Sequence, residues 1–421
     1  MDHDVTEPPP PAPVSLDEAI RLLEEDGRAH AASRGAPVTV PLAEALGRVL
    51  ASDLASLADH PNVDDTALDG IACRRADTEG ASDEAPVTLR LIGESAAGRP
   101  FDGEVGAGQA IRIQTGAAVP RGADAIVPVE RIRDENERVQ VYETASMDAI
   151  RPRGQDVRAG DVGLRAGRRL DAGALALAAA MGHQAVSVHR KTRVGVLTGG
   201  DEVVAPGGTL GPGDVYDANG PALQALVRLA GAEPVVLPHA SDAVGALEDA
   251  VDGTDALDLL LTCGGISMGR YDRVRDLLET RGRIVFRKVW LKPGGPATFA
   301  YLGDRPWLAL PGNPVSASVT FLALARAWLD RASGATGPLP LSQRLPAYAA
   351  TTLRAAGPKT TLLRVLLDRD GQRLSARPAG NQNSGVVRTL ADADALAIVP
   401  PHAVLEPGDP VDVVPLAAHL S

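Results

Sequence analysis

The sequence predicts a multidomain α/β protein built around a parallel β-sheet. Its 421 residues are enough for roughly three domains at about 150 residues per domain. From residue 192 to about 334, continuous apolar runs alternate with amphipathic stretches, which is the pattern of parallel strands covered by helices on both faces. Shorter β-type runs, separated by glycine, proline and aspartate, lie on either side of this segment and predict β-rich domains.

The chain is expected to begin with a disordered lead, residues 1–13. Helices and then strands are expected to follow it. Residues 1–13 are acidic and then proline-rich, and they lack the features of a signal peptide. Ser15 and Glu18 have the spacing of a capping box, so a helix is expected from residue 16. A second short helix is expected over residues 42–50. Strands are expected over residues 87–93, 110–116, 123–130 and 138–143.

The remaining elements complete the α/β segment and a C-terminal unit. The run IVFRKVWL, residues 284–291, is expected to be one strand, which would bring Lys288 and Lys292 to the same face. The tail, from about residue 341, returns to short strands and Pro/Gly turns. It predicts a small β-barrel or sandwich.

Composition excludes several classes of function. The net charge is −12 and aromatic residues make up 3% of the chain, so neither broad phosphate-backbone binding nor base stacking is expected, and no nucleic acid partner is predicted. No run approaches the about 20 apolar residues of a membrane span. Cys73 and Cys263 belong to no zinc-site spacing and suggest no disulfide framework, so a reducing cytoplasm is expected.

Three acidic residues each follow a different predicted strand of the α/β segment: Glu202, Asp242 and Asp272. Loops at the carboxyl ends of parallel strands converge on one crevice. A carboxylate cluster there would suit Mg²⁺, which binds oxygen ligands and substrate phosphates. The alternative is that these are solvated loop or helix-capping acids.

Two glycine pairs, Gly199–Gly200 and Gly264–Gly265, also follow apolar strands. Their backbone N–H groups could approach an anion closely. Neither pair belongs to a P-loop or to a dinucleotide-binding fingerprint, so simple chain reversal is the alternative.

Lysine is rare, accounting for four of the 42 basic residues. Lys288 and Lys292 are only four residues apart, and a compact ammonium suits a phosphate or oxyanion. The alternative is that both are solvated lysines at a strand end.

The PGNP segment, residues 311–314, is expected to form a rigid loop, which either contacts a ligand or only turns the chain. Asp69, in DDTALDG, first suggests a turn, although clustered acids also suit metal or base chemistry.

Eight segments between Asp64 and Phe321 occur in a specific order and spacing: DDTALDG, AIRIQTGAAVPRGADAIV, RPRGQDVRAG, TGGDEV, DVYDANG, GGISMGRYD, KVWLKPGGP and LPGNPVSASVTF. Together they resemble the molybdopterin molybdenumtransferase family, called MoeA in bacteria and related to the gephyrin E domain. Weaker similarity extends over nearly the whole chain.

The resemblance implies a fold, a reaction and partners. The disordered lead would be followed by a discontinuous elongated domain (14–58 and 145–186), a β-rich domain (59–144), a molybdopterin-binding-like α/β domain (187–334) and a C-terminal β-barrel (335–421). The implied reaction is Mg²⁺-assisted insertion of molybdate into adenylylated molybdopterin, with release of AMP. A homodimer with the active site at the subunit interface is implied, and molybdopterin adenylyltransferase and apo-molybdoenzymes are possible further partners.

The matching motifs also assign roles to residues. The resemblance implies catalytic roles for Asp69, Glu202 and Asp272, and metal binding by Glu202, Asp242 and Asp272. The implied substrate and anion contacts are Thr115, Gly116, Gly199, Gly200, Gly264, Gly265, Lys288, Lys292, Pro311, Gly312, Asn313, Pro314, Arg364 and Ser384. Asp156, in the RxRGxD pattern, has either a structural role at a domain junction or a catalytic one.

Three departures from the family pattern bear on activity. Asp65 adds a carboxylate next to Asp69, which is expected to disfavour ionisation of both. Gly199 stands where the family has a threonine hydroxyl. Gly295 stands where a second lysine helps to hold molybdate, and losing a charged partner costs about 1.5–3 kcal/mol. A divergent paralogue that binds molybdopterin or a protein partner, with weak or no insertion activity, is therefore the alternative. A different nucleotide-handling α/β enzyme ranks last, because it would need a phosphate motif that is absent.

Overall fold

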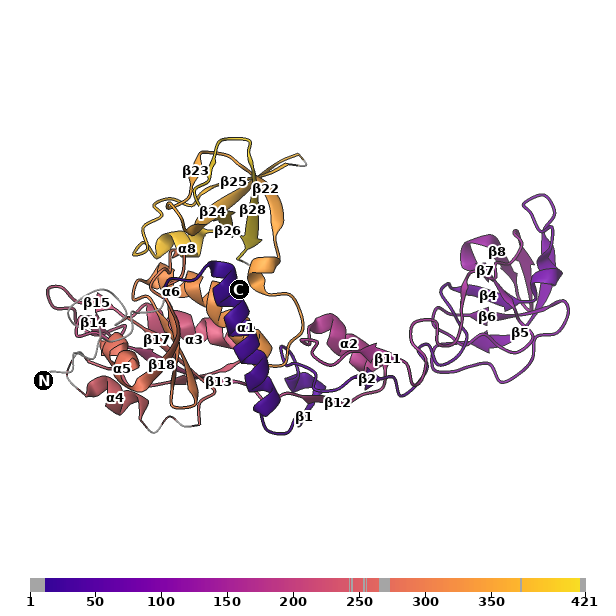
Figure 1. Ribbon diagram of the computed structural model, residues 1–421. Helices are drawn as coiled ribbons and strands as arrows, with labels where there is room; N and C mark the ends of the chain where they lie inside the picture. Colours follow the sequence, from indigo (N-terminus) through magenta and orange to yellow (C-terminus); the bar gives the residue numbers. More distant parts are fainter. Residues whose placement is uncertain are drawn as a thin grey trace, which may run out of the picture.

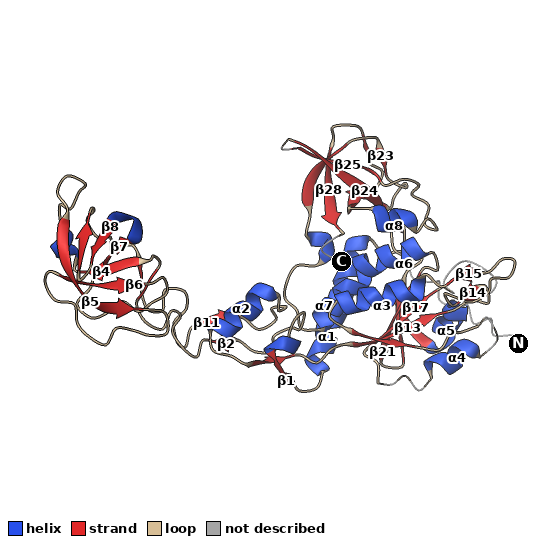
Figure 2. Cartoon of the chain, turned by 180° about the vertical axis from the view of Figure 1, so that it is seen from behind, coloured by secondary structure: helices blue, strands red, loops and turns tan. Residues whose placement is uncertain are grey.

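The computed structural model describes residues 12–416 apart from 242, 244, 253, 255, 265–272 and 372. An α/β unit and a small β-barrel lie together at one end of the molecule, and a β-rich unit lies at the far end of a narrow arm (Figures 1 and 2). This arrangement confirms the predicted multidomain α/β fold class. Of the predicted disordered lead, residues 1–11 lie outside the described residues. In the part of the chain described, no helix is long and apolar enough to cross a membrane.

The α/β unit is organised by a six-stranded sheet in which four neighbouring strands are parallel. The strand order is β16 (Glu233–Val236), β13 (Arg193–Thr198), β17 (Leu259–Cys263), β21 (Arg305–Leu310), β20 (Thr298–Leu302) and β18 (Gly282–Arg287). β20 runs antiparallel to both of its neighbours. The chain leaves β13 for β16 on one side and returns to β17 on the other, so the strand order reverses at β13.

Helices cover both faces of this sheet. The side chains of Leu259 and Leu261 belong to one buried core, and that of Leu260 belongs to the opposite one, as the alternation of a strand requires. The first core is shared with α1 (Leu16–Ser33), α3 (Asn219–Leu229), α6 (Pro314–Thr320), the π-helical η4 (Phe321–Ala325) and α7 (Arg326–Ala332). The second is shared with α4 (Ala246–Val251) and α5 (Arg273–Arg281).

Helix α1 begins as predicted and packs on the α/β unit. The Ser15 side chain accepts a hydrogen bond from the Glu18 backbone N–H at 3.1 Å. Leu16, Ala19 and Leu23 are buried in the core that contains α7. The apolar face of this helix is therefore buried against the α/β unit.

The arm is formed by two segments of the chain that lie side by side. β1 (Val38–Pro41) pairs with β12 (Ala185–Val188), β2 (Leu54–Ala55) pairs with β11 (Val162–Leu164), and α2 (Ala172–Ala180) packs beside them. The predicted helix over residues 42–50 is wrong, since only Leu42–Glu44 form a 3-10 turn (η1). Val49 and Leu50 are instead drawn into bridges with Arg169 and Val188.

The β-rich unit contains a six-stranded sheet, and its buried apolar side chains form two separate clusters. Its order is β7 (Ala125–Pro128), β4 (Gly70–Cys73), β6 (Gln109–Ile113), β5 (Val87–Ser95), β9 (Arg138–Val141) and β8 (Ile132–Glu135). The 3-10 turns η2 (Arg75–Thr78) and η3 (Val129–Arg131) lie beside it. A two-residue pair, β3 (Asp65–Thr66) with β10 (Ile150–Arg151), joins it to the arm.

The C-terminal unit is a closed barrel, which settles the predicted choice between barrel and sandwich. The strands follow the order β24 (Thr360–Asp370), β25 (Arg373–Pro378), β22 (Leu345–Ala349), β28 (Pro410–Pro415) and β26 (Ala395–Val399), and β26 pairs again with β24. From the α/β unit, β19 (Leu291–Lys292) adds to β24. The smaller elements are η5 (Pro340–Ser342), β23 (Leu353–Arg354), α8 (Arg388–Asp392) and β27 (Val404–Leu405), with β14 (Val203–Val204) and β15 (Val215–Tyr216) in the α/β unit.

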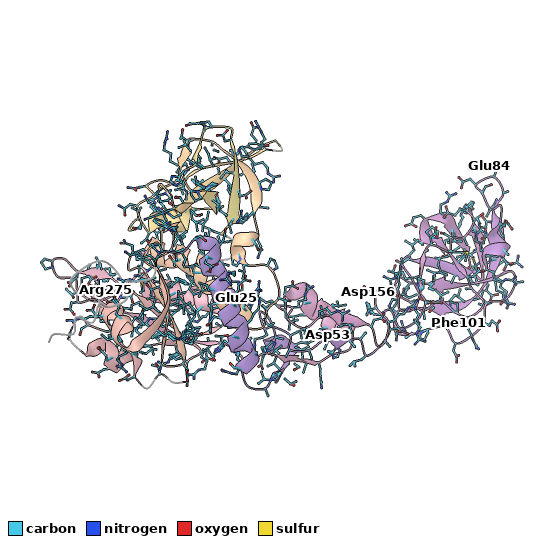
Figure 3. The ribbon with its side chains drawn as sticks, in the orientation of Figure 1. Glu25, Asp53, Glu84, Phe101, Asp156 and Arg275 are labelled. Atoms are coloured by element: carbon cyan, nitrogen blue, oxygen red, sulfur yellow. The ribbon has the colours of Figure 1, made fainter. Side chains whose placement is uncertain are left out.

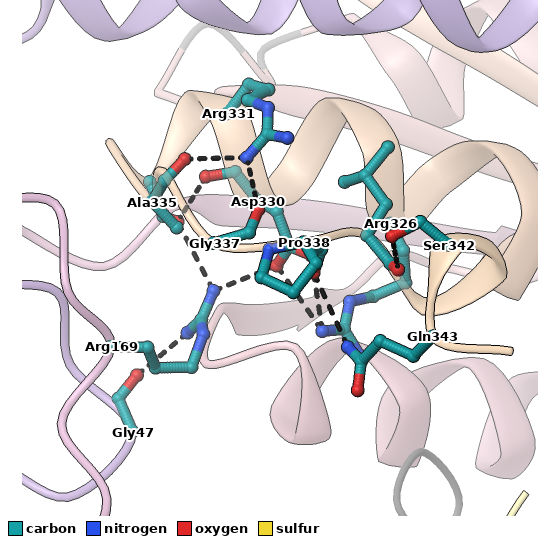
Figure 4. Close-up of polar contacts among 12 residues, drawn as sticks. Gly47, Arg169, Arg326, Asp330, Arg331, Ala335, Gly337, Pro338, Ser342 and Gln343 are labelled. Atoms are coloured by element: carbon teal, nitrogen blue, oxygen red, sulfur yellow. Dashed lines mark hydrogen bonds and ion pairs between the residues drawn. The ribbon is translucent and has the colours of Figure 1, made fainter. Parts of the chain in front are cut away.

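A buried ionic cluster connects the arm to the α/β unit. Asp330 on α7 is 5% exposed and accepts hydrogen bonds from Arg169 of the arm at 2.9 Å and from Arg326 at 3.3 Å (Figure 4). Arg169 also donates to the Gly47 carbonyl at 2.8 Å. The two guanidinium groups share one buried carboxylate, which fixes the start of the arm relative to α7.

Candidate active site

A cavity of about 760 Å³ lies at the carboxyl ends of the parallel strands. Its wall is formed by the loops after β13, β17 and β21, at the point where the strand order reverses. Ligands of open α/β sheets bind at this position, and the volume is within the range of small-molecule sites. The structure brings together here eight of the predicted residues: Gly199, Gly200, Glu202, Gly264, Pro311, Gly312, Asn313 and Pro314.

Two glycines let the cavity wall form. Gly200 has a φ of +124°, and a Cβ added there would lie 2.5 Å from Oε2 of Glu202. A larger residue would therefore displace the carboxylate. A Cβ on Gly312 would lie 3.3 Å from the Cα of Gly264, so the loops after β21 and β17 are in close backbone contact.

Sequence reasoning missed Asp217 and Asn219, which also line the cavity. Asp217 accepts a hydrogen bond from the Thr198 hydroxyl at 3.0 Å and from the backbone N–H groups of Asn219 and Gly220 at 3.0 and 2.8 Å. Asn219 donates through Nδ2 to the Gly312 carbonyl at 2.7 Å. These contacts tie the end of β13, the start of α3 and the PGNP loop together. The sequence Asp-Ala-Asn-Gly, residues 217–220, at a helix start was the available signal.

The Glu202 carboxylate at the cavity is of the chemical type that a hard cation prefers. Glu202 contributes a carboxylate to the wall, and Mg²⁺ is commonly held by one or two carboxylates together with substrate phosphates. Asp242 and Asp272, the other predicted metal ligands, and Gly265 lie outside the described residues. Among the residues that are described, no group of three or more His, Cys, Asp or Glu side chains is placed to hold a metal.

The predicted lysine pair does not share one strand. β18 ends at Arg287, and Lys288 takes a φ of +65°. The chain then continues as a loop in which only Leu291 and Lys292 form a strand, pairing with the barrel. Lys292 is exposed, and the loop after it carries Pro296 to the cavity wall. The expectation of a common face was wrong because the chain turns at Lys288.

Arg364 and Ser384 organise a barrel loop that reaches the cavity. The Arg364 side chain is buried, which lowers the pKa of its guanidinium. It donates to the Thr389 hydroxyl at 2.9 Å and to the carbonyls of Asn381 and Asn383 at 3.1 and 3.3 Å. The Ser384 carbonyl accepts from the Val315 N–H at 3.2 Å. Gly385 and Val387 of the same loop line the cavity.

Asp69 and Thr115 meet in the β-rich unit, away from the cavity (Figure 1). The Thr115 backbone N–H and hydroxyl both donate to Oδ1 of Asp69, and these bonds lower the pKa of the exposed carboxyl. The expected rise caused by Asp65 is therefore wrong for Asp69. The Asp65 carboxylate instead forms a two-point pair with Arg151, at 2.7 and 2.8 Å. Gly116 donates to the Thr66 carbonyl at 2.8 Å and closes the turn beside Thr115.

Asp156 lies where the arm meets the β-rich unit (Figure 3). Its side chain is exposed, and its backbone N–H donates to the His60 carbonyl at 3.0 Å. This placement is at a domain junction, distant from the cavity along the chain's elongated axis.

Family comparisons cover most of the chain. Residues 14–182 match the MoeA N-terminal region (domain I and II), residues 195–331 match a probable molybdopterin binding domain, and residues 346–416 match the MoeA C-terminal region (domain IV). The chain is 37% identical to molybdopterin molybdenumtransferase 2 of Mycobacterium tuberculosis, over 87% of this chain and 92% of that protein. It is 33% identical to the molybdopterin molybdenumtransferase of Bacillus subtilis, over 92% and 90% of the two chains.

Solved structures agree with these matches. A molybdopterin biosynthesis MoeA protein from Pyrococcus horikoshii superposes with a TM-score of 0.78 at 25% identity, covering 96% of this chain and 100% of that one. A second structure from the same organism gives a TM-score of 0.70 at 29% identity, covering 96% and 99%. The chain belongs to the molybdopterin molybdenumtransferase (MoeA) family of transferases in molybdenum cofactor biosynthesis.

Proposed function

We propose that the chain catalyses the Mg²⁺-assisted insertion of molybdate into adenylylated molybdopterin, with hydrolysis of the pyrophosphate link and release of AMP. The observation that carries this proposal is the cavity at the reversal point of the α/β sheet, which combines glycine-lined loops with the Glu202 carboxylate. An adenylylated pterin is a large anionic ligand. It needs a cavity of several hundred Å³ with backbone donors and oxygen ligands for a counter-cation.

The residues of the cavity have separable roles in this proposal. The glycine loops at Gly199–Gly200 and Gly264 let the phosphates approach the backbone closely. Asp217 and Asn219 hold the β13 loop and the PGNP loop in register with each other. Glu202 would hold Mg²⁺, which would supply positive charge against the phosphates of the substrate. Lys288 and Lys292 add positive charge at the loop that leads to Pro296.

We propose that the working unit is a homodimer in which the β-rich unit of one subunit reaches the cavity of the other. Asp69 and Thr115 lie at the far end of the arm from the cavity of their own chain (Figure 2). Large apolar side chains are exposed beside Asp69: Leu68, which precedes it, at 41%, and Val129, whose N–H donates to the Asp69 carbonyl at 2.9 Å, at 51%. Clustered apolar exposure of this kind is typical of a surface that another protein covers.

We expect the protein to act in the cytoplasm, between two other steps of molybdenum cofactor synthesis and use. A molybdopterin adenylyltransferase would supply the adenylylated substrate, and apo-molybdoenzymes would receive the product. The two cysteines, Cys73 and Cys263, are buried free thiols, in keeping with a reducing compartment.

An insertion assay tests the proposed activity. Purified protein is incubated with Mg²⁺, molybdate and adenylylated molybdopterin, and AMP release and activation of an apo-molybdoenzyme are measured for wild type and for Asp69→Ala. We expect a molybdate-dependent product from wild type and a large loss in the variant. No molybdate-dependent product at micromolar enzyme contradicts the proposal.

Gly295 favours a second candidate, a divergent paralogue that binds molybdopterin or a protein partner and inserts molybdenum weakly or not at all. The family position of a molybdate-holding lysine lacks a side chain in this chain. The same assay separates the two candidates, because the paralogue would bind the adenylylated substrate without converting it.

A further inference from the structure

Lys359 of the barrel lies close to Gly295, the position of the α/β loop at which this chain has no lysine. A Cβ built on Gly295 would lie 3.8 Å from Nζ of Lys359. The same point lies 3.2 Å from the Leu291 carbonyl oxygen and 3.5 Å from that of Val289. The ammonium group of the barrel therefore lies at van der Waals distance from the point where a side chain at position 295 of the α/β unit would begin.

The backbone around Lys359 is fastened to this loop. β19 pairs with β24 in parallel, with Leu291 opposite Thr360, and the Thr360 N–H donates to the Trp290 carbonyl at 3.0 Å. The Val289 N–H donates to the Gly295 carbonyl at 2.8 Å and closes the loop on itself. Lys359 directly precedes the first paired residue, so its approach to Gly295 is set by the sheet and not by a free loop.

The charge of Lys359 is not used elsewhere in the described structure. Its side chain is half-buried, and none of the acidic residues that the structure describes forms an ion pair with it. Lys292, three residues before Gly295, is exposed on the same loop. A partly desolvated ammonium with three donors is a strong site for a compact anion.

We propose that Lys359 binds the tetrahedral oxyanion substrate, supplying from the barrel the cation that position 295 of the α/β loop lacks. This inference rests on the proposed function and names a binding residue for its molybdate. The oxyanion site would then combine Lys292 of the α/β unit with Lys359 of the barrel. It also means that Gly295→Lys in the wild-type chain gains little, because the new side chain would start beside an ammonium of the same charge.

A charge series at position 359 tests the inference. Lys359→Met keeps the length of the stem and removes the charge, Lys359→Arg keeps the charge, and Lys191→Met makes the same charge change at an exposed lysine of another loop. The KM for molybdate is measured in the insertion assay, and the binding of adenylylated molybdopterin is measured without molybdate. We expect Lys359→Met to raise the molybdate KM about ten- to a hundredfold with unchanged pterin binding. Lys359→Arg and Lys191→Met should remain within about threefold of wild type.

A second comparison separates direct binding from a merely structural role. Gly295→Lys is introduced into wild type and into Lys359→Met, and thermal unfolding of each variant is followed. We expect Gly295→Lys to lower the molybdate KM of Lys359→Met at least about fivefold and that of wild type by less than about twofold. A wild-type molybdate KM in a folded Lys359→Met protein, or equal effects of Gly295→Lys in both backgrounds, overturns the inference. Absence of insertion by the wild-type protein instead overturns the proposed function.

Discussion

The Asp69 carboxylate accepts two hydrogen bonds from a single residue, Thr115. The backbone N–H of Thr115 lies 2.6 Å from Oδ1 of Asp69, and the Thr115 hydroxyl lies 2.9 Å from the same oxygen. The backbone bond first, and the hydroxyl second, hold the pKa of Asp69 below its usual value. The β-rich unit therefore presents a fixed carboxylate and not a carboxylic acid at this position.

The acid side of the pH–activity profile should depend on Thr115. A lowered pKa keeps Asp69 charged until the pH falls through that lowered value, so activity that needs the carboxylate is lost only in strong acid. Thr115→Val removes the hydroxyl donor, raises the pKa of Asp69 and moves the acid limb to higher pH. Thr88→Val, at an exposed strand position of the same unit, is the control. An acid limb of kcat/KM that stays in place in Thr115→Val shows that Asp69 ionisation does not limit the reaction.

Gly200 should be required for the position of the Glu202 carboxylate. Gly200→Ala introduces a Cβ 2.5 Å from the present Oε2 position, so the carboxylate must move. We expect an increase of about tenfold or more in the Mg²⁺ concentration needed for half-maximal activity. The measurement is a Mg²⁺ titration of AMP release.

Gly207→Ala is a matched control for this variant. Gly207 also has a positive φ, of +92°, but no atom lies within 4 Å of its Cβ position. It therefore reports backbone strain without displacement of a carboxylate. Equal Mg²⁺ dependence of the two variants would mean that strain, and not the position of Glu202, explains the effect.

The buried carboxylate of Asp330 should hold the arm to the α/β unit. Asp330→Asn removes the negative charge with which Arg169 and Arg326 both pair. The two guanidinium groups then stay largely buried without a countercharge from Asp330. Breaking a buried pair from one side costs about 3–5 kcal/mol. We expect a clearly lower urea midpoint, measured by the fluorescence of the three tryptophans, one of which, Trp328, lies on α7.

An exposed ion pair provides the comparison for Asp330. Asp392 pairs with Arg388 on α8, and both side chains are at least half exposed, so Asp392→Asn should cost about 0.5 kcal/mol or less. Similar midpoint shifts in the two variants would contradict a stabilising role for the Asp330 cluster.

The sequence was most informative where local patterns repeat. Alternating buried strands such as Leu259–Cys263 predicted the α/β unit, and the capping spacing of Ser15 and Glu18 predicted the start of α1. Its errors fall where tertiary contacts override local pattern. The segment 42–50 is drawn into bridges with distant strands, and the run through Lys288 turns because the following residues pair with Val14 and with the barrel.

The candidate site was only partly predictable for the same reason. Glycine turns, strand-end acids and the PGNP loop can be recognised in the sequence, and eight residues of these three kinds line the cavity. Asp217 and Asn219 act through contacts with Thr198 and Gly312, which are distant in the chain. The approach of Lys359 to Gly295 depends on the docking of two units, which no local pattern reveals.

The central claim, that the active site combines the β-rich unit of one subunit with the cavity of the other, is tested most directly by complementation. Asp69→Ala and Glu202→Gln proteins, each inactive alone, are mixed under conditions that exchange subunits, and insertion activity is measured. A mixed dimer then contains one site with both residues intact, so random exchange should restore about a quarter of wild-type activity. No recovery, with subunit exchange verified by mass spectrometry, would contradict the claim.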